Sequence, residues 1–189
     1  MKVPEKIDKK TLLHICCAPC AAPALFDLSG NDYLTGFFYN PNIHPDEEYE
    51  KRLGELPKIS EIFKTPYVTI RSDYSVFLQF IKGLEQEPEG GARCVKCFEL
   101  RLEKAFKYAS QNGFSYVGTT LSTSPHKNVK VINSIGNAIA ERYENIKFME
   151  FDFKKKDGFK KSVLLCEKYF IYRQKYCGCH FSKISREKI

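Results

Sequence analysis

Several features are scarce or missing in this sequence, and each absence narrows the class of protein. It has no tryptophan and only two methionines, and no apolar run approaches the ~18 residues of a transmembrane helix. Cysteine makes up 8 of 189 residues, well below the ~8–10% typical of a disulfide scaffold. A chain of this length can bury roughly 70% of its unfolded surface, so it needs no covalent cross-links for stability. The sequence therefore argues against a disulfide-stapled protein and against a membrane-spanning one.

Two features of the sequence predict a cytoplasmic location, its charged N-terminal segment and its low cysteine content. The segment MKVPEKIDKK leads directly into a strand-like segment, so we expect no secretory signal. We predict a soluble, cytoplasmic protein with a single domain over residues 1–189, reduced thiols and no membrane partner. In that compartment, paired cysteines more often bind metals or act in catalysis than form structural disulfides.

The net charge is +7, from 30 basic and 23 acidic residues. This balance is consistent with an anionic partner, although a solvated surface that leans basic is the simpler explanation. One segment combines five lysines with two aromatic residues: Phe153, Lys154, Lys155, Lys156, Phe159, Lys160 and Lys161. Basic residues with interleaved aromatics are typical of a nucleic-acid contact, and an exposed helix start can have the same composition.

Strand-like and helix-like segments alternate along the whole chain. The predicted strands are Thr11–Cys17, Leu34–Tyr39, Pro66–Arg71, Tyr116–Thr120 and Ile146–Phe153. The predicted helices are Pro19–Leu28, Asp46–Phe63 (bent at Pro57), Asp73–Ile81, Cys97 to about Gly113, Pro125–Tyr143 and Lys160–Lys175. Alternation of this kind predicts an α/β fold with a Rossmann-like parallel sheet and helices on both faces. The polar stretch Glu85–Arg93 is the best candidate for a mobile active-site loop.

Ligands of such folds bind outside the carboxyl ends of the strands, and the residues suited to chemistry fall at that edge. Cys16, Cys17 and Cys20 follow the first strand, and His44 lies in the loop after the second. The segment Ser122–Asn128, which contains His126, follows the fourth strand. Its hydroxyls and free amides could form a phosphate cradle or an ordinary capped helix start. For both histidines, ligand binding and a solvent-facing loop position are equally open.

Seven of the eight cysteines fall into three clusters, two of which contain a CxxC motif. These motifs are Cys17–Cys20 and Cys94–Cys97. Two such motifs in a cytosolic chain indicate four thiolates around one metal centre, which is typical of zinc or an iron–sulfur cluster. Cys16 is a fifth thiol that a closed zinc site would leave without a role, and spacing does not decide which four ligate. A thioredoxin-like site is disfavoured by the second CxxC, the missing tryptophan and the chain length.

The third cluster is Cys177-Gly178-Cys179, in which one residue separates two thiols. Such a pair is a poor set of simultaneous ligands for one metal, but it can form a small, strained and easily reduced disulfide. That property suits a pair that gives up two electrons in each turnover. The alternative is that one thiol is a metal ligand and the other packs in the core. Cys166 shares a predicted helical face with Val163 and Phe170, so we expect it to pack in the core.

Six segments carry a resemblance to a known family. They are HICCAPC at 14–20, FYNPNIHPDEEYEKR at 38–52, KGLEQEPEGGARCVKCFELRLEKA at 82–105, TTLSTSPHKN at 119–128, DFKKKDGFKKS at 152–162 and YRQKYCGC at 172–179. Together they resemble the cobalamin-independent epoxyqueuosine reductases, the QueH family, over nearly the whole chain. The resemblance implies a HUP-type Rossmann-like domain and the last step of queuosine biosynthesis. In that step, the epoxide of epoxyqueuosine at the wobble position of tRNA is reduced to an alkene.

The resemblance also implies roles for individual cysteines. It implies a [4Fe–4S] cluster held by Cys16, Cys17, Cys94 and Cys97, with a redox-active pair at Cys177 and Cys179. Cys20 is then left near the cluster, where it could hold an accessory iron or act on the substrate. Removal of the epoxide oxygen takes two electrons and two protons. A cluster passes single electrons, and an open iron can act as a Lewis acid on the oxygen.

The mechanistic hypothesis that follows has three parts. Iron at or near the cluster weakens the C–O bond, Cys177 and Cys179 end as a disulfide, and an external electron donor resets that pair. Tyr39, His126 and Cys20 are candidate proton donors. The basic segment at 153–161 and the helix start at Ser122–Asn128 become candidate contacts for the tRNA backbone.

Two alternatives come from other functional classes. A zinc-stabilised RNA-binding module without catalysis explains four cysteines and the charge, but it gives Cys16, Cys177 and Cys179 no role. An adenylating or sulfur-transferring enzyme on the same fold needs a glycine-rich phosphate loop of the SGGxDS type after the first strand. This chain has CCAPCAAP there, without glycine, which disfavours ATP binding.

Overall fold

The computed structural model describes residues 8–187, with only the backbone of Lys156, Arg186 and Glu187, so the charged segment at residues 1–7 lies outside it. Its centre is a five-stranded sheet with the order β3-β2-β1-β4-β5, and every strand pair is parallel. The strands are β1 (Thr11–His14), β2 (Leu34–Phe38), β3 (Tyr67–Thr69), β4 (Tyr116–Thr119) and β5 (Lys147–Phe148). The predicted α/β class and the Rossmann-like parallel sheet are confirmed.

The strands supply side chains alternately to two apolar cores, one on each face of the sheet. Leu12 of β1 and Phe37 of β2 belong to one core, whereas Leu13 and Phe38 belong to the other. All four side chains are fully buried. Because both faces are covered, the strands are short continuous apolar runs rather than alternating ones, as expected for a buried parallel sheet.

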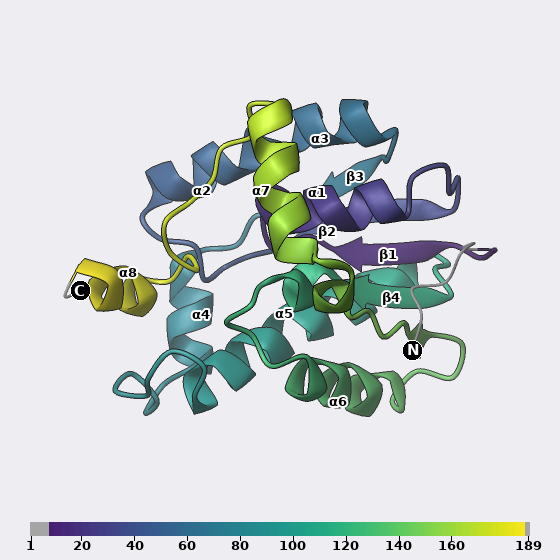
Figure 1. The fold of residues 1–189 in the computed structure, drawn as a ribbon. Helices are drawn as coiled ribbons and strands as arrows, with labels where there is room; N and C mark the ends of the chain where they lie inside the picture. Colours follow the sequence, from purple (N-terminus) through teal and green to yellow (C-terminus); the bar gives the residue numbers. More distant parts are fainter. Residues whose placement is uncertain (1–7, 188–189) are drawn as a thin grey trace.

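Helices cover both faces of the sheet, as predicted (Figure 1). The face with Leu13 and Phe38 packs against α1 (Ala18–Asp27), α3 (Leu56–Phe63) and α7 (Gly158–Lys168). The opposite face packs against α5 (Ala92–Gln111) and α6 (Val129–Ala140). Among the helices of residues 8–187, none is both long and apolar enough to cross a bilayer.

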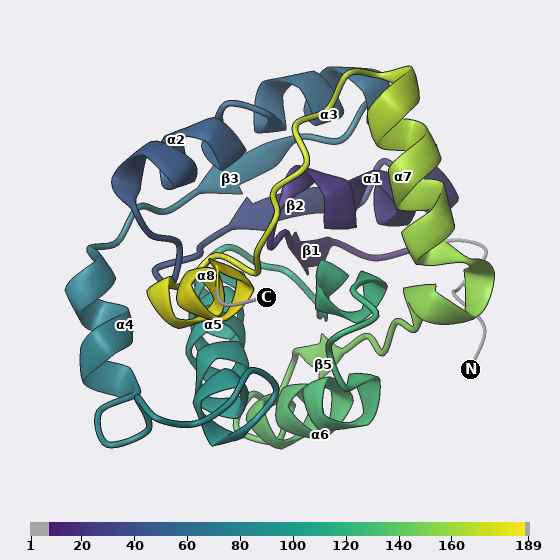
Figure 2. The same ribbon diagram turned by 60° about the vertical axis from the view of Figure 1, so that its left-hand side comes forward.

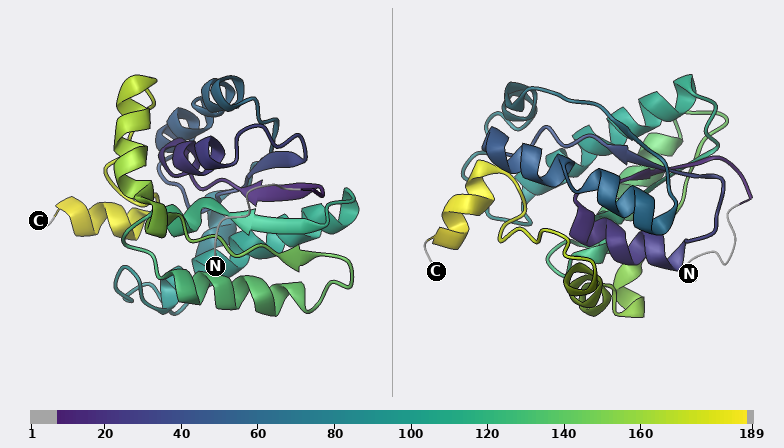
Figure 3. Two further views of the ribbon diagram at one scale, coloured as in Figure 1. Left: turned by 45° about the vertical axis from the view of Figure 1, so that its right-hand side comes forward. Right: turned by 90° about the horizontal axis from the view of Figure 1, so that it is seen from above.

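Three further helices are α2 (Asp46–Leu53), α4 (Tyr74–Phe80) and α8 (His180–Glu187). Figures 1 and 3 show α8 beyond the carboxyl ends of the strands, and Figure 2 views the molecule with that side forward. A small apolar cluster of Phe77, Ile81, Cys97 and Cys179 joins α4, α5 and the segment before α8. Two short 3₁₀ turns, η1 (Thr120–Thr123) and η2 (Phe153–Lys156), follow β4 and β5. The C-terminal cysteines thus return to the edge where the strands end.

The predicted last helix, Lys160–Lys175, is wrong at its C-terminal end. Helix α7 stops at Lys168, and the amide of Ile171 donates to the carbonyl of Cys166 at 2.9 Å, while Phe170 takes a left-handed φ of 52°. This is a Schellman ending. The left-handed position usually holds glycine, and because Phe170 occupies it here, no helix-ending residue marks this point in the sequence. Residues beyond it are therefore irregular, and α8 was not predicted.

Two other helix starts differ from the prediction. Helix α5 begins at Ala92 rather than Cys97, and the Glu87 carboxylate accepts the Ala92 amide at 2.9 Å. Helix α6 begins at Val129 rather than Pro125, because the Asn128 side chain caps the amides of Lys130 and Val131. The first change places Cys94 and Cys97 on one helix, and the second leaves Ser122 outside the helix start.

The remaining differences are changes of length. The predicted helix Asp46–Phe63 is two helices, α2 and α3, that break at Gly54-Glu55, just before Pro57. The fifth strand is two residues long instead of eight, because the chain after Phe148 leaves the sheet and Phe153 begins η2. The predicted cap of α4 is confirmed, since the Asp73 carboxylate accepts the Ser75 amide at 2.7 Å.

Candidate active site and metal centre

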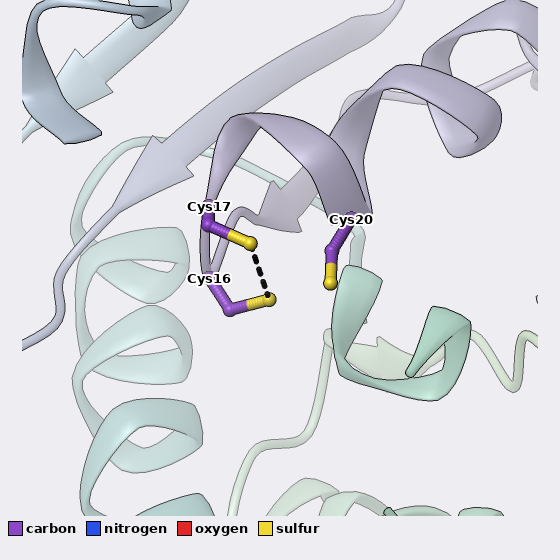
Figure 4. A group of neighbouring side chains, drawn as sticks. All are labelled: Cys16, Cys17 and Cys20. Atoms are coloured by element: carbon purple, nitrogen blue, oxygen red, sulfur yellow. Dashed lines mark hydrogen bonds between the residues drawn. The ribbon is translucent and has the colours of Figure 1, made fainter. Parts of the chain in front are cut away.

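The first cysteine group lies where β1 ends and α1 begins, beside the point at which the strand order reverses. Cys16 and Cys17 form the turn, and Cys20 lies in the first turn of α1. The three sulfur atoms lie within 4.8 Å of one another, and the side chains point toward one another (Figure 4). Cys16 Sγ and Cys17 Sγ are 3.9 Å apart. The crevice beside such a switch point is the usual ligand site of an open α/β sheet.

Hydrogen bonds within this group distribute the protons unequally. The thiols of Cys17 and Cys20 donate to Cys16 and hold its pKa well below the ordinary value. Their bonds to Cys16 raise the pKa of Cys17 to about 12, and the pKa of Cys20 also rises. The group therefore stabilises one thiolate on its own. A second or third thiolate requires a positive charge at the same place.

Polar neighbours fix the cysteine turn from two other segments. The amide of Cys16 donates to Thr120 Oγ1 at 3.2 Å, and Thr123 Oγ1 donates to the Cys20 carbonyl at 3.0 Å. Gln174 Nε2 lies 3.0 Å from Cys17 Sγ, to which it can donate. The 3₁₀ turn after β4 and the irregular segment after α7 therefore both contact the start of α1.

The second cysteine group is carried by the N-terminal end of α5. Cys94 and Cys97 are three residues apart on this helix, so they share one side of it. The amide of Gly90 donates to Cys94 Sγ at 3.2 Å. Burial raises the pKa of Cys97 to about 12 and that of Cys94 above its ordinary value. Both thiols line a small cavity together with Cys177 and Cys179.

The third group, Cys177-Gly178-Cys179, is held through its backbone by Arg52 of α2. The Arg52 side chain is 2% exposed, and its Nη1 and Nη2 donate to the carbonyls of Cys177 at 2.8 Å and Tyr176 at 3.1 Å. Arg52 Nε donates to Glu48 at 2.7 Å, and Tyr172 donates its hydroxyl to the other Glu48 oxygen at 2.8 Å. A buried ion pair thus fixes this turn through its backbone carbonyls rather than through its sulfurs.

Gly178 allows the backbone to make this turn. Its φ of 138° lies in a region that side chains rarely adopt, and a Cβ there would lie 2.9 Å from Arg52 Nη1. The Gly178 carbonyl accepts the His44 amide at 2.9 Å. All eight cysteines lie within residues 8–187 and are free thiols. Cys177 and Cys179 are therefore in the reduced form, and the disulfide expected of them is not formed in this structure.

The three groups surround two cavities that share lining residues. The larger cavity, of about 260 Å³, is lined by Cys16, Cys17, Cys20 and Cys177. The smaller one is lined by Cys94, Cys97, Cys177 and Cys179. Cys177, Arg101 and Glu89 line both cavities. Cys177 therefore lies between the thiols of α1 and those of α5.

Two cations face these thiols, the buried Arg101 and the partly exposed Lys127. Arg101 is 2% exposed, donates from Nε to the Cys97 carbonyl at 3.0 Å, and has no partner for Nη2 among the described residues. Burial lowers the pKa of Arg101, but Cys97 and Cys177 outweigh this and raise it. Lys127 lines the larger cavity, and its pKa also rises despite burial, because four cysteines attract its charge. These positive charges stabilise negative charge on the sulfurs.

Comparison with known proteins agrees with this geometry. The family model for epoxyqueuosine reductase QueH matches residues 11–185. An epoxyqueuosine reductase QueH from Streptococcus pyogenes is 40% identical over 184 residues, covering 94% of this chain and 72% of that protein. One from Thermotoga maritima is 36% identical over 184 residues, covering 94% of this chain and 92% of that protein. A third, from Acinetobacter baylyi, is 39% identical over 184 residues, covering 96% of this chain and 84% of that protein.

This chain belongs to the epoxyqueuosine reductase QueH family. As a family member it is an oxidoreductase, which the cysteine-lined cavities suit. A solved structure, the U34-tRNA thiolase NcsA from Methanococcus maripaludis with its [4Fe-4S] cluster, has a TM-score of 0.55 and 12% identity. The match covers 94% of this chain and 62% of that chain, and at this identity it supports the fold alone.

The donor set of this chain fits an iron–sulfur group. Three thiols within 4.8 Å are soft ligands of the kind that such clusters prefer, and they require a cation to be deprotonated together. The predicted ligands Cys16 and Cys17 belong to this group, and so does Cys20, which was expected near the cluster to hold an accessory iron or act on the substrate. The predicted ligands Cys94 and Cys97 instead line the neighbouring cavity. Spacing could not show this division, because it depends on how α5 faces α1.

The structure places the other predicted candidates in different surroundings. His126 lines the larger cavity, but Tyr39 is buried in the core beneath α5, and His44 stacks on Tyr74 with ring centroids 4.6 Å apart. Ser122 and Thr123 are buried in η1, and Thr123, Ser124 and Lys127 line the larger cavity, so the phosphate cradle at Ser122–Asn128 stays a prediction. Cys166 is buried in the core as expected, although Phe170, assigned to the same face, is 86% exposed.

Sequence reasoning missed three residues that shape the site, Arg52, Arg101 and Gln174, whereas Lys127 lies in the predicted segment Ser122–Asn128. Arg101 lies four residues after Cys97, so one helical turn places it beside that thiol. This spacing was a usable signal. Arg52 and Gln174 offered none, because their contacts join segments more than a hundred residues apart.

Proposed function

We propose that this protein reduces epoxyqueuosine to queuosine at the wobble position of tRNA. The substrate's epoxide-bearing cyclopentane ring would occupy the larger cavity, beside Cys16, Cys17, Cys20 and Cys177. Its relatives carry the name epoxyqueuosine reductase, and the chain matches them over nearly its full length. The observation that carries the proposal is the position of Cys177, which lines both the cavity of the α1 thiols and the cavity of the α5 thiols.

The thiol pair can supply what the reaction consumes. Oxidation of Cys177 and Cys179 to one disulfide releases two electrons and two protons. The epoxide takes up the two electrons and the two protons. Its two C–O bonds break, and an alkene and one water form. A thiol or other external two-electron donor then restores the pair. The Cys-Gly-Cys spacing gives a small, readily reduced ring, which suits repeated turnover.

A [4Fe–4S] cluster, when bound, would supply single-electron transfer and a Lewis acid. We propose Cys16 and Cys17 as ligands, and the three-sulfur group supports Cys20 as a further one. Cys94 and Cys97 remain the predicted partners from α5. Lys127 and Arg101 line the cavity as cations that would stabilise negative charge developing on the epoxide oxygen. His126, on the same cavity wall, is the remaining histidine candidate for proton transfer.

The rim of the cavity fits an anionic substrate. Lys127, Arg173 and Lys175 line it, and Lys160 follows the lining residue Phe159. Glu89 is the acidic residue of the same lining. We propose that these basic side chains contact the tRNA backbone. If so, affinity for tRNA should fall steeply with salt, and a slope near zero in log affinity against log salt would contradict these contacts.

Anaerobic purification with analysis of bound metal tests the proposal. We expect brown protein that contains iron and acid-labile sulfide and converts epoxyqueuosine in tRNA to queuosine. Colourless protein with stoichiometric zinc and no conversion would support the zinc-stabilised RNA-binding alternative instead. Two variants purified in the same way, Cys20→Ser and Cys94→Ser, distinguish the three-sulfur group from the predicted quartet of Cys16, Cys17, Cys94 and Cys97. Loss of iron in Cys20→Ser supports the three-sulfur group, whereas full iron retention there with loss in Cys94→Ser supports the predicted quartet.

A further inference from the structure

Phe159 is an exposed aromatic residue on the wall of the reaction cavity. It lies in the first turn of α7, 52% of it is exposed, and it lines the larger cavity together with Cys16, Cys17 and Cys20. Water contact by a large apolar ring is unfavourable, so such a ring beside a reaction cavity suggests a surface that a ligand covers.

The structure separates Phe159 from the other phenylalanine of the basic segment. Phe153 is 1% exposed and stacks on Phe151 in the core, with ring centroids 5.0 Å apart. It therefore has a structural role. Of these two aromatics, Phe159 alone is available to a partner.

Contacts from two other segments position the Phe159 ring. The Arg173 guanidinium lies 5.7 Å from its ring centroid, and Arg173 Nη1 donates to Ser162 Oγ at 3.1 Å. Ser162 in turn donates to the Pro19 carbonyl at 2.6 Å. Phe159 and Ser162 are three residues apart on α7 and share a side of that helix. The ring therefore lies on the side of α7 that contacts the start of α1, and it lines the same cavity as Cys20.

The charges near the ring suit a nucleic acid. Lys160 and Lys175 are exposed, and Arg173 lies over the ring, whereas Lys161 is paired with Asp27 at 2.7 Å and Lys154 donates to two backbone carbonyls. The nearby acidic residues are Glu89 on the cavity wall and Asp157 at the start of α7. Aromatic rings flanked by cations are the common platform for unpaired bases.

We infer that Phe159 stacks on the nucleobase that carries the epoxide-bearing ring. This inference rests on the proposed function and adds a residue that recognises the base rather than the phosphates. A short linker joins the epoxide-bearing ring to its base, so a ring placed among the thiols leaves that base at the cavity wall where Phe159 lies. Stacking there would fix the distance between the epoxide and the sulfurs.

The test compares variants of the iron-loaded enzyme on two substrates, the free epoxyqueuosine nucleoside and an RNA stem–loop that carries it. Phe159→Ala should raise KM about tenfold for both substrates. It should leave the dependence of RNA affinity on salt unchanged, because stacking releases no counterions. Phe159→Tyr should restore KM. The matched control is Phe26→Ala, since Phe26 is 51% exposed but is not among the cavity-lining residues, and it should behave as wild type.

Lys160→Ala provides the opposite pattern. This variant should lower the affinity for the RNA stem–loop but not for the nucleoside. If Lys160 contacts one phosphate of a single strand, the slope of log affinity against log salt should fall in magnitude by about 0.7. The inference is overturned if Phe159→Ala matches wild type, if it affects the stem–loop but not the nucleoside, or if it changes the salt slope. A wild-type enzyme that reduces neither substrate defeats the proposed function itself, so the two failures are distinguishable.

Discussion

The turn at Cys16–Cys20 and the turn at Cys177–Cys179 both bring thiols to the same cavity, but the fold holds them in different ways. The first turn is part of the strand–helix junction of the sheet, and its three sulfurs lie within 4.8 Å of one another. The second belongs to an irregular segment and is fixed by hydrogen bonds from Arg52 to backbone carbonyls.

This difference separates two chemical roles. Sulfurs gathered at a rigid junction can hold a metal at one place, because little has to move when it binds. Sulfurs on a turn that is anchored by its backbone can change their bonding partner while the turn stays in place. This difference supports our proposal that the first turn binds metal and that the second undergoes thiol oxidation.

Replacement of single cysteines by serine should have the largest effects and should distinguish the two turns. Cys16→Ser should lose iron and all activity, because it removes a member of the three-sulfur group. Cys177→Ser should keep its iron and lose multiple turnover, because no disulfide can form. Iron analysis and steady-state assays with tRNA check both. Equal iron loss in the two variants would show that the turns do not have separate roles.

Loss of Arg52 should have the next largest effect. Arg52→Gln leaves the Glu48 carboxylate buried without its cation and should lower the free energy of unfolding by about 3–5 kcal/mol. If the variant folds, turnover should fall with iron content unchanged. Denaturant unfolding and iron analysis measure these effects.

Arg71→Gln is the matched control for Arg52. Arg71 also pairs with carboxylates of α2, Asp46 and Glu50, but all three side chains are exposed. We expect this variant to keep wild-type stability and activity. An equal loss in the two variants would show that the ion pairs of α2 stabilise the helix and not the cysteine turn.

Substitution of Gly178 by alanine should have a smaller effect on the same cysteine turn. Gly178→Ala places a Cβ 2.9 Å from Arg52 Nη1 at a φ of 138°, and should cost about 1–3 kcal/mol and slow turnover. Gly30 also has a positive φ, of 80°, but a Cβ there meets nothing within 4 Å. Gly30→Ala should therefore keep full activity. Steady-state rates and thermal unfolding of the two variants test this, and wild-type turnover in Gly178→Ala would contradict the role of the turn.

Substitution of Cys166 should have the smallest effect on stability, iron content and activity. It is buried in the core of the α1 face and does not line either cavity. Cys166→Ala should cost roughly 1 kcal/mol of stability and leave iron content and activity unchanged. Denaturant unfolding and the standard assay measure both, and a loss of iron would reveal an unexpected eighth member of the site.

The sequence predicted the sheet, its flanking helices and the three cysteine groups, because hydrophobic periodicity and short motifs are local. It placed Cys20 near Cys16 and Cys17 but left open which thiols bind the metal, since this depends on side-chain directions at one turn. The end of α7 was missed because Phe170 takes a position that glycine usually holds. Arg52 was missed because its partners lie on a segment about 125 residues away, which only the folded chain brings close.

The central claim is that Cys177 and Cys179 provide the two electrons for each reduced epoxide. A single-turnover reaction of the iron-loaded enzyme with epoxyqueuosine-containing tRNA, without external reductant, tests it most directly. Nucleoside analysis counts the queuosine formed, and mass spectrometry of the digested protein counts the disulfides. We predict one Cys177–Cys179 disulfide for each queuosine. Queuosine formed while both thiols stay free would contradict the claim.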